Sequence, residues 1–424
     1  MPAKPAIEGG TPVRTEPYPP WPYFWEEEKQ AVLEVLDSGK VNYWTGFRGM
    51  EFQKRFAAYC NAKHAIALNS GTSALHVALA AAQVGPGDEV IVPSYTFIAT
   101  AAAVLHQNAV PIFADVDERT YNLDPRAAEA AITPRTRAII PVHLHGHPAD
   151  MDAFMALAKK HGLVIVEDAA QAHGAEYQGR KVGALGHLAA FSMCQDKIFT
   201  TGGEGGMVTT DDDEMSETAR TFKDHGYWEE ERRTLLEMEA LYPYIHHRMG
   251  FNYRMTEMQS ALGMVCLARL DEWIAKRRAN AAFLTRHIAQ MPPLEPPYES
   301  PDVKHAYYKY VFRIRPERLK VSRDRFIEAL RAEGIPCIAG VPPENQREEV
   351  FEKLRGYGRT TCPFECPWYK DRGGSVDYSR MDTPVAREIG AKSVWLLVHP
   401  TVEEKDLRDV VNALEKLVEA YAVT

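Results

Sequence analysis

Short apolar runs alternate with amphipathic stretches of helix length from Ala65 onward. A strand that is buried on both faces reads as a continuous apolar run, whereas a helix that covers a sheet repeats its apolar positions every three or four residues. The alternation therefore predicts an α/β fold, with a mostly parallel sheet and helices on both faces. The expected strands span residues 65–68, 89–92, 110–114, 138–142, 163–166, 189–192 and 206–209.

One of the intervening helices can be predicted with both of its ends. Apolar side chains recur at helical spacing over residues 151–158, and either Asp150 or Asp152 can cap the first turn. Gly162 is placed to end this helix, because glycine readily adopts the left-handed conformation found there. A predicted strand follows at once.

A second unit begins after a long predicted helix over residues 270–291. Paired prolines at 292–293 and 296–297 mark the boundary, and they precede a strand-like segment at 307–314. Two further helices are expected, at 323–333 and 403–420. Residues 342–383 are rich in proline, glycine, aromatic and charged residues without periodicity, which predicts long loops that cover another part of the protein.

These features predict three parts of the chain. The first residues contain several prolines and an aromatic cluster, so we expect residues 1–30 to form an N-terminal arm. A large α/β domain is expected over 31–268, and a smaller C-terminal α+β domain over 269–424.

Composition and charge exclude several classes of protein. Of the 424 residues 45% are apolar and 25% are charged, as in ordinary globular proteins, and the net charge of −9 argues against a nucleic-acid partner. No apolar stretch approaches the ~20 residues that span a bilayer, and the start of the chain lacks the apolar core of a signal peptide. We therefore expect a cytoplasmic protein without a membrane partner.

The six cysteines are irregularly spaced, which is typical of free thiols in a reducing compartment and not of a disulfide framework. Cys362 and Cys366 are the close pair among them. With no second pair and no histidine nearby in the sequence, we interpret them as two thiols in a proline-rich loop instead of a zinc site.

Polar residues follow several of the predicted strands, and ligands collect at the carboxyl ends of the strands in open α/β sheets. After the first strand, residues 69–75 form a glycine turn that enters a helix, whose free N–H groups and dipole suit a phosphate. Gly71 allows the turn, and Thr72 and Ser73 could add hydroxyl donors. Serine and threonine also begin many helices that bind nothing, so this segment alone is weak evidence.

Three further side chains make the pattern specific. Asp168, after the fifth strand, could pair with a pyridinium nitrogen, although a carboxylate there could also cap the next helix. Ser192, after the sixth strand, is a candidate phosphate ligand, and Lys197 is a candidate imine-forming amine. A phosphate-binding turn, an aspartate, a serine and a lysine follow separate strands in this order, which is not expected of solvated surface residues. The pattern therefore predicts a site for pyridoxal 5′-phosphate.

The same segments resemble the DegT/StrS-type aminotransferases, which place amino groups on sugars and cyclitols and belong to the fold-type I pyridoxal phosphate enzymes. The resemblance runs from about Trp44 to Pro400. Its most specific pieces are residues 69–75, 93–97, 167–174, 191–197, 204–206 and 250–255.

The resemblance implies a role for each matching position. Phe97 would stack on the cofactor ring, Asp168 would bind the ring nitrogen, and Gln171 would lie near the ring oxygen. The phosphate would be held by Gly71, Thr72, Ser73 and Ser192. Asn252 would reach the phosphate of the neighbouring subunit, so a homodimer with shared active sites is implied.

The resemblance also implies transamination. The related sugar dehydratases carry a histidine where this chain has Lys197. With the lysine present, an amino group would pass from glutamate or glutamine to the cofactor, giving pyridoxamine phosphate, and then to a ketone. A dehydratase and a non-catalytic regulator are the alternatives. Lys197 disfavours a dehydratase. A non-catalytic regulator would need a DNA-binding helix pair or an active site that has lost its catalytic residues, and we find neither.

Tyr308 bears on the acceptor. Nucleotide-sugar members of the family commonly carry a histidine at this position, whereas a tyrosine is more like the branch that acts on keto-cyclitols such as scyllo-inosose. Residues 394–400 point weakly the same way. We expect an inosose-like acceptor, in aminosugar, aminocyclitol or antibiotic biosynthesis, with a nucleotide-linked keto-sugar as the alternative.

Several histidines have plainer explanations. His143, His145 and His147 alternate like metal ligands, but they lie where a strand becomes a turn, and the resemblance places no metal there. We therefore expect no metal site. His225 is a candidate for contact with the substrate, although a helix end would also explain His225-Gly226.

Overall fold

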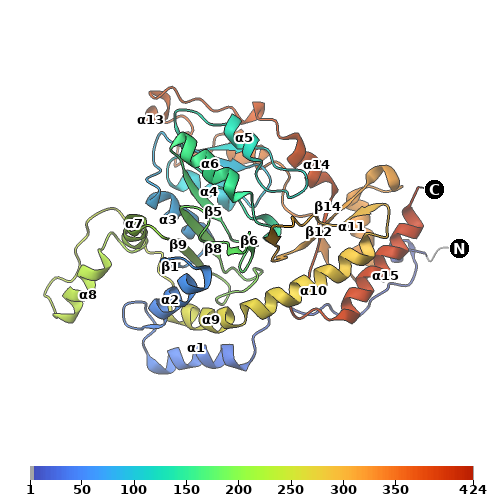
Figure 1. Ribbon diagram of the computed structural model, residues 1–424, viewed down its shortest axis with the longest axis horizontal. Helices are drawn as coiled ribbons and strands as arrows, with labels where there is room; N and C mark the ends of the chain where they lie inside the picture. Colours follow the sequence, from blue (N-terminus) through green and yellow to red (C-terminus); the bar gives the residue numbers. More distant parts are fainter. Residues whose placement is uncertain (1–3, 424) are drawn as a thin grey trace.

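The computed structural model describes residues 4–423 and contains a seven-stranded sheet (Figure 1). All of the expected strands are present, in the order β1-β9-β8-β5-β4-β2-β3. The strand β9 runs antiparallel to both of its neighbours, and the other pairs are parallel. The strands are β1 (His64–Leu68), β2 (Glu89–Pro93), β3 (Val110–Ala114), β4 (Thr136–Ile139), β5 (Val164–Asp168), β8 (Leu188–Ser192) and β9 (Gly206–Thr210).

The side chains of this sheet enter two separate cores, because successive residues of a strand point to opposite faces. In β1, Ala65 and Ala67 belong to one core, and Ile66 and Leu68 belong to the other. The first core includes α2 (Arg48–Cys60), α6 (Met151–His161), α9 (Glu257–Ala268) and the start of α10 (Leu270–Ile288). The second includes α3 (Gly71–Ala81), α4 (Ala99–His106) and α7 (Asp213–Lys223).

The helix α6 has the ends that its sequence predicts. The carboxylate of Asp150 accepts a hydrogen bond from the amide of Ala153 at 3.1 Å. Gly162 follows the last turn with a φ of 68°, in the left-handed region. Local side-chain chemistry therefore sets the length of this helix.

The C-terminal part of the chain forms a third core around an antiparallel sheet of the order β10-β12-β14-β13. Its strands are β10 (Leu294–Glu295), β12 (Tyr310–Ile314), β13 (Cys337–Ile338) and β14 (Ser393–Leu396). The helices α10, α11 (Arg323–Ala332) and α15 (Glu404–Tyr421) pack on it. A three-stranded sheet is made of β6 (Glu176–Tyr177), β7 (Arg180–Lys181) and β11 (Val303–Lys304).

The other helices are short or lie near the surface. They are α1 (Glu26–Ser38), α5 (Pro125–Ala130), α8 (Glu229–Glu237), α12 (Glu349–Glu352), α13 (Pro367–Lys370) and α14 (Pro384–Lys392). The 3-10 turns are η1 (Ala6–Glu8), η2 (Leu144–Gly146), η3 (Pro316–Arg318), η4 (Asn345–Arg347) and η5 (Tyr378–Arg380).

The N-terminal arm lies on its own chain. The guanidinium of Arg14 pairs with Asp406 and Asp409 of α15, each at 2.8 Å. The carboxylate of Glu333 accepts from the amides of Ala6 and Val13. Since α1 begins at Glu26, the irregular part of the arm is shorter than residues 1–30.

The segment 342–383 consists of loops and short helices that cover one face of the main sheet. Phe351, Phe364 and Tyr378 are buried in the second core, where Phe351 and Tyr378 contact Phe113 of β3. These aromatic side chains explain why a segment without periodicity is held in place.

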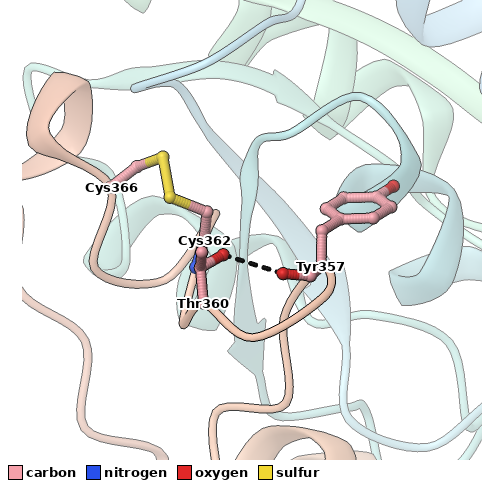
Figure 2. The surroundings of a disulfide bond; sticks show 4 residues. All are labelled: Tyr357, Thr360, Cys362 and Cys366. Carbon is pink, nitrogen blue, oxygen red and sulfur yellow. Dashed lines mark hydrogen bonds between the residues drawn. A yellow bond between two sulfur atoms is a disulfide. The ribbon is translucent and has the colours of Figure 1, made fainter.

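One interpretation of the cysteines was wrong, because Cys362 and Cys366 form a disulfide (Figure 2). The amide of Cys366 donates to the carbonyl of Pro363 at 3.3 Å, and this turn brings the Cα atoms of the two cysteines to 4.7 Å. That separation lies within the range a disulfide requires. Sequence spacing does not reveal such a turn. The other cysteines are free.

Across residues 4–423, no helix combines the length and the apolar character needed to cross a membrane.

Candidate active site

A cavity of about 370 Å³ lies at the carboxyl ends of β5 and β8. Strand register brings its walls together, because Ser192 is paired with Gly206, and Gly206 with Leu68. The turn after β1 therefore meets the end of β8. Of the predicted site residues, the cavity is lined by Gly71, Thr72, Phe97, Asp168, Gln171, Ser192, Lys197 and Tyr308. The C-terminal part closes it with Ile338, Gly340, Val341 and Trp395.

The first turn of α3 forms an anion cradle. Ser70 caps the helix by accepting from the amide of Ser73 at 3.1 Å. Among the described residues, the amides of Gly71 and Thr72 have no acceptor, as expected at the start of a helix. A Cβ atom on Gly71 would lie 2.4 Å from the Cβ of Ser192, so only glycine permits this close approach. Two free amides and the helix dipole suit a phosphate.

Asp168 is the buried carboxylate of the cavity. Its side chain accepts hydrogen bonds from the Thr100 hydroxyl at 2.8 Å and from the Ala170 amide at 3.1 Å. Burial raises the pKa of Asp168, although both hydrogen bonds oppose that effect. A protonated ring nitrogen would provide the positive charge that favours the ionised carboxylate.

Gln171 and Phe97 face the same space. The Gln171 side-chain oxygen accepts from the amide of His145 at 2.8 Å, which leaves its NH₂ group free to donate toward the cavity. Phe97 is 57% exposed, which is unusual for so large an apolar ring. A planar cofactor lying on Phe97 would cover it.

Lys197 lies in the turn between β8 and β9, where its amide donates to the carbonyl of Cys194 at 3.1 Å. Its Nζ atom is 4.7 Å from the centre of the Tyr308 ring. The Tyr308 hydroxyl donates to Asp196, and the Nζ atom of Lys309 lies 3.7 Å from the same carboxylate. Burial lowers the pKa of Lys309 to about 8.

Three predicted residues do not line the cavity. The Ser73 hydroxyl turns back to donate to the side chain of Asn69 at 2.7 Å. Asn252 is exposed and forms a backbone bridge with Asp224. His225 lies beside Tyr227, with ring centres 5.8 Å apart, outside the residues that line the cavity.

Two of the three alternating histidines, His143 and His147, have side-chain hydrogen-bond partners, whereas the ring of the buried His145 has none among the described residues and packs edge-on against Trp395, with ring centres 4.4 Å apart. His143 accepts from the amide of Ala149 through Nδ1, so its Nε2 carries the proton and donates to the buried Glu167 at 3.0 Å. His147 contacts the Pro148 carbonyl and accepts from the amide of Ser300. Between residues 4 and 423, no group of three or more His, Cys, Asp or Glu side chains could hold a metal ion.

Sequence reasoning missed several residues around the cavity. Thr100 follows Phe97 by three residues, and this helical spacing is the signal that could have found it, because its partner Asp168 lies 68 residues away in the sequence. Asp196 directly precedes Lys197 and accepts the hydrogen bond of the Tyr308 hydroxyl. A buried tyrosine hydroxyl usually finds such a partner, so Asp196 was a candidate. Nothing local could have revealed Trp21, whose indole N–H donates to the carbonyl of Lys197 at 2.9 Å across 176 residues.

The arrangement fits pyridoxal phosphate. It offers free amides for a phosphate, a buried carboxylate for a ring nitrogen, an amide donor for a ring oxygen and an amine for the aldehyde. These groups converge on one cavity from the turns after separate strands.

Comparison with known proteins agrees with a site for pyridoxal phosphate. Residues 22–372 match the DegT/DnrJ/EryC1/StrS aminotransferase family. The GDP-perosamine synthase of Caulobacter vibrioides is 44% identical over 92% of this chain and 95% of its own length. The L-glutamine:2-deoxy-scyllo-inosose aminotransferase of Micromonospora echinospora is 36% identical over 97% of both chains. Among solved structures, an aminotransferase from Psychrobacter cryohalolentis superimposes with a TM-score of 0.85 at 41% identity, covering 95% of this chain and 99% of that chain.

Proposed function

This chain belongs to the DegT/DnrJ/EryC1/StrS aminotransferase family, and from that premise we propose the residues, substrates and assembly through which it works. The family consists of pyridoxal-phosphate-dependent aminotransferases, and this chain is one of them. Several of its relatives bear the names of sugar or cyclitol aminotransferases. In our proposal, Lys197 holds the cofactor, and the amino group passes from glutamate or glutamine to a ketone on a ring.

Pyridoxal phosphate, when bound, supplies an electron sink for the carbon that carries the amino group. Asp168 keeps the ring nitrogen protonated, and Thr100 fixes the orientation of that carboxylate. The Nζ atom of Lys197 would hold the cofactor and, as a free amine, would accept and return the proton that the amino donor gives up. Gly71, Thr72 and Ser192 hold the phosphate, and Gln171 donates to the ring oxygen.

We propose an inosose-like keto-cyclitol as the acceptor. The observation that carries this proposal is Tyr308, which occupies the cavity wall beside Lys197 where nucleotide-sugar members of the family commonly have histidine. A tyrosine hydroxyl bound to Asp196 presents a polar edge to a ring hydroxyl.

A nucleotide-linked keto-sugar is the second candidate. It is favoured by the relative at 44% identity, whose name, GDP-perosamine synthase, refers to a nucleotide-linked sugar. A nucleotide would have to extend past the wall that Ile338, Gly340 and Trp395 form.

A panel of ketones separates the two candidates. Purified enzyme is supplied with glutamate or glutamine and with 2-deoxy-scyllo-inosose, scyllo-inosose, or GDP- and dTDP-linked 4-keto sugars, and the products are identified by mass. Amination of the inososes supports the proposal, and amination of nucleotide-linked ketones alone contradicts it. Lys197→Ala should abolish every product, whereas Lys181→Ala, which removes an amine from the surface, should leave the activity unchanged.

We also propose a homodimer. The segment 228–249 carries α8 away from the rest of the molecule (Figure 1). It exposes large apolar side chains that a monomer would leave in water, and a second copy of the chain would bury them. They are Trp228, Leu236, Met238, Leu241, Tyr242, Tyr244, Ile245 and Met249. Exposed Asn252 lies three residues after this segment, as expected if it reaches the phosphate of a neighbouring subunit.

A further inference from the structure

Trp21 of the N-terminal arm lies against the backbone of Lys197. Its indole N–H donates to the Lys197 carbonyl at 2.9 Å. The turn that carries Lys197 belongs to neither strand, so this carbonyl is not part of the sheet hydrogen bonding. The indole therefore restrains the one residue of the turn whose amine must reach the cavity.

The position of Trp21 is itself strongly determined. Its ring packs edge-on against Trp273 of α10, with centres 5.3 Å apart, and stacks on His399 at 5.9 Å. The carbonyl of Pro20, the residue before it, accepts from the Thr401 hydroxyl at 2.8 Å. The arm thus carries a rigid donor, since a planar indole that stacks on one ring and packs edge-on against another has little freedom to turn.

The buried Arg277 extends the same cluster toward the other wall of the cavity. Its guanidinium carbon lies 5.3 Å from the Trp21 ring centre. Its Nη1 atom donates to the carbonyls of Tyr307 and Tyr308, at 3.3 and 3.2 Å. Arg277 is only 1% exposed, and its charge is offset by these carbonyls and the aromatic ring. The backbones of Lys197 and Tyr308 are therefore held by adjoining side chains.

We propose that Trp21 is a positioning residue, which fixes the main chain of Lys197 through its indole N–H and so sets where the amine meets the cofactor. This inference rests on the proposed role of Lys197. Displacing a reacting group by about 1 Å can cost roughly 10²-fold in rate, so one hydrogen bond at this point is enough to matter.

The test compares Trp21→Phe with Trp25→Phe. Both tryptophans belong to the same aromatic cluster and pack on Trp273, but the indole of Trp25 makes no hydrogen bond to Lys197. Each protein is studied without cofactor by hydrogen exchange of peptides covering residues 193–203, and with cofactor by kcat, KM and the pH dependence of the cofactor absorbance.

Trp21→Phe should speed exchange in residues 193–203, lower kcat by roughly tenfold to 10²-fold with a smaller change in KM, and shift the pH profile of the absorbance. Trp25→Phe should change none of these more than twofold. Equal effects of the two substitutions, or unchanged exchange and kcat in Trp21→Phe, would overturn the proposal.

Two further comparisons cover a variant that does not fold and a result in which exchange and activity disagree. If Trp21→Phe does not fold, replacing the indole by benzothiophene removes the N–H and keeps the ring shape, with the same expected changes. If exchange rises while kcat and the absorbance stay unchanged, the hydrogen bond exists but does not position the amine, and the proposal fails. Failure of Lys197→Ala to abolish cofactor attachment would instead defeat the proposed role of Lys197.

Discussion

Some residues of the cavity would act through their charge and others by orienting a neighbour. Asp168 belongs to the first kind, because its carboxylate would balance the charge of a protonated ring nitrogen. Asp168→Asn keeps the shape and can still accept from Thr100, but it cannot balance a protonated ring nitrogen. We expect kcat to fall by roughly 10²–10³-fold, the range seen when one stabilising group is removed from an active site. Steady-state kinetics measures this. Thr100→Val, which removes only the orienting hydrogen bond, should cost less, and equal losses in the two variants would contradict the assignment.

Lys223 is a buried lysine outside the cavity, and it makes stability depend on pH. Burial lowers the pKa of Lys223 from 10.5 to about 8. Between these values the unfolded chain keeps a proton that the folded chain has released, so the free energy of unfolding rises with pH across this window. Lys309 acts in the same direction, because burial lowers its pKa to about 8 as well.

Lys223→Met should therefore raise the free energy of unfolding below pH 8 and flatten its rise between pH 8 and 10.5. Urea denaturation at a series of pH values measures both effects. Lys181→Met, which removes a lysine that forms a surface ion pair with Asp271, is the matched control. An identical pH dependence in the two variants would show that burial of Lys223 is not the cause.

At the scale of elements, the first turn of α3 is the feature most directly tied to the cofactor. Gly71→Ala places a methyl group 2.4 Å from the Cβ of Ser192, and such overpacking typically costs about 1–3 kcal/mol. We expect weaker cofactor binding, measured by titration of the apoprotein, together with lower stability. Gly85→Ala has open space around the added methyl group, so it should change neither. Unchanged cofactor affinity in Gly71→Ala would argue against the cradle.

Many of the helices and strands could be predicted from the sequence. The strands of the main sheet and the ends of α6 follow from local patterns, and residues placed after strands converge because parallel strands end at one edge. The disulfide and the contact between Trp21 and Lys197 could not be predicted. They depend on turns and distant packing that leave no periodic signal in the sequence.

The whole molecule should be a dimer that buries the segment 228–249. Leu241 and Tyr242 are 84% and 78% exposed, so replacing both by glutamate would place charge in the proposed interface. We expect the double variant to become monomeric in analytical ultracentrifugation and to lose activity. Trp368→Glu, a matched change at a side chain 70% exposed on α13, should leave the dimer intact. A wild-type monomer with full activity would contradict the proposal.

The central claim concerns which amine of the chain holds the cofactor, and one measurement tests it most directly. Borohydride reduction of the holoenzyme fixes the cofactor to its lysine, and peptide mass spectrometry then locates it. We predict the added mass on Lys197. The same mass on Lys309, the neighbouring amine beside Tyr308 and Asp196, or on any other lysine, would contradict the account.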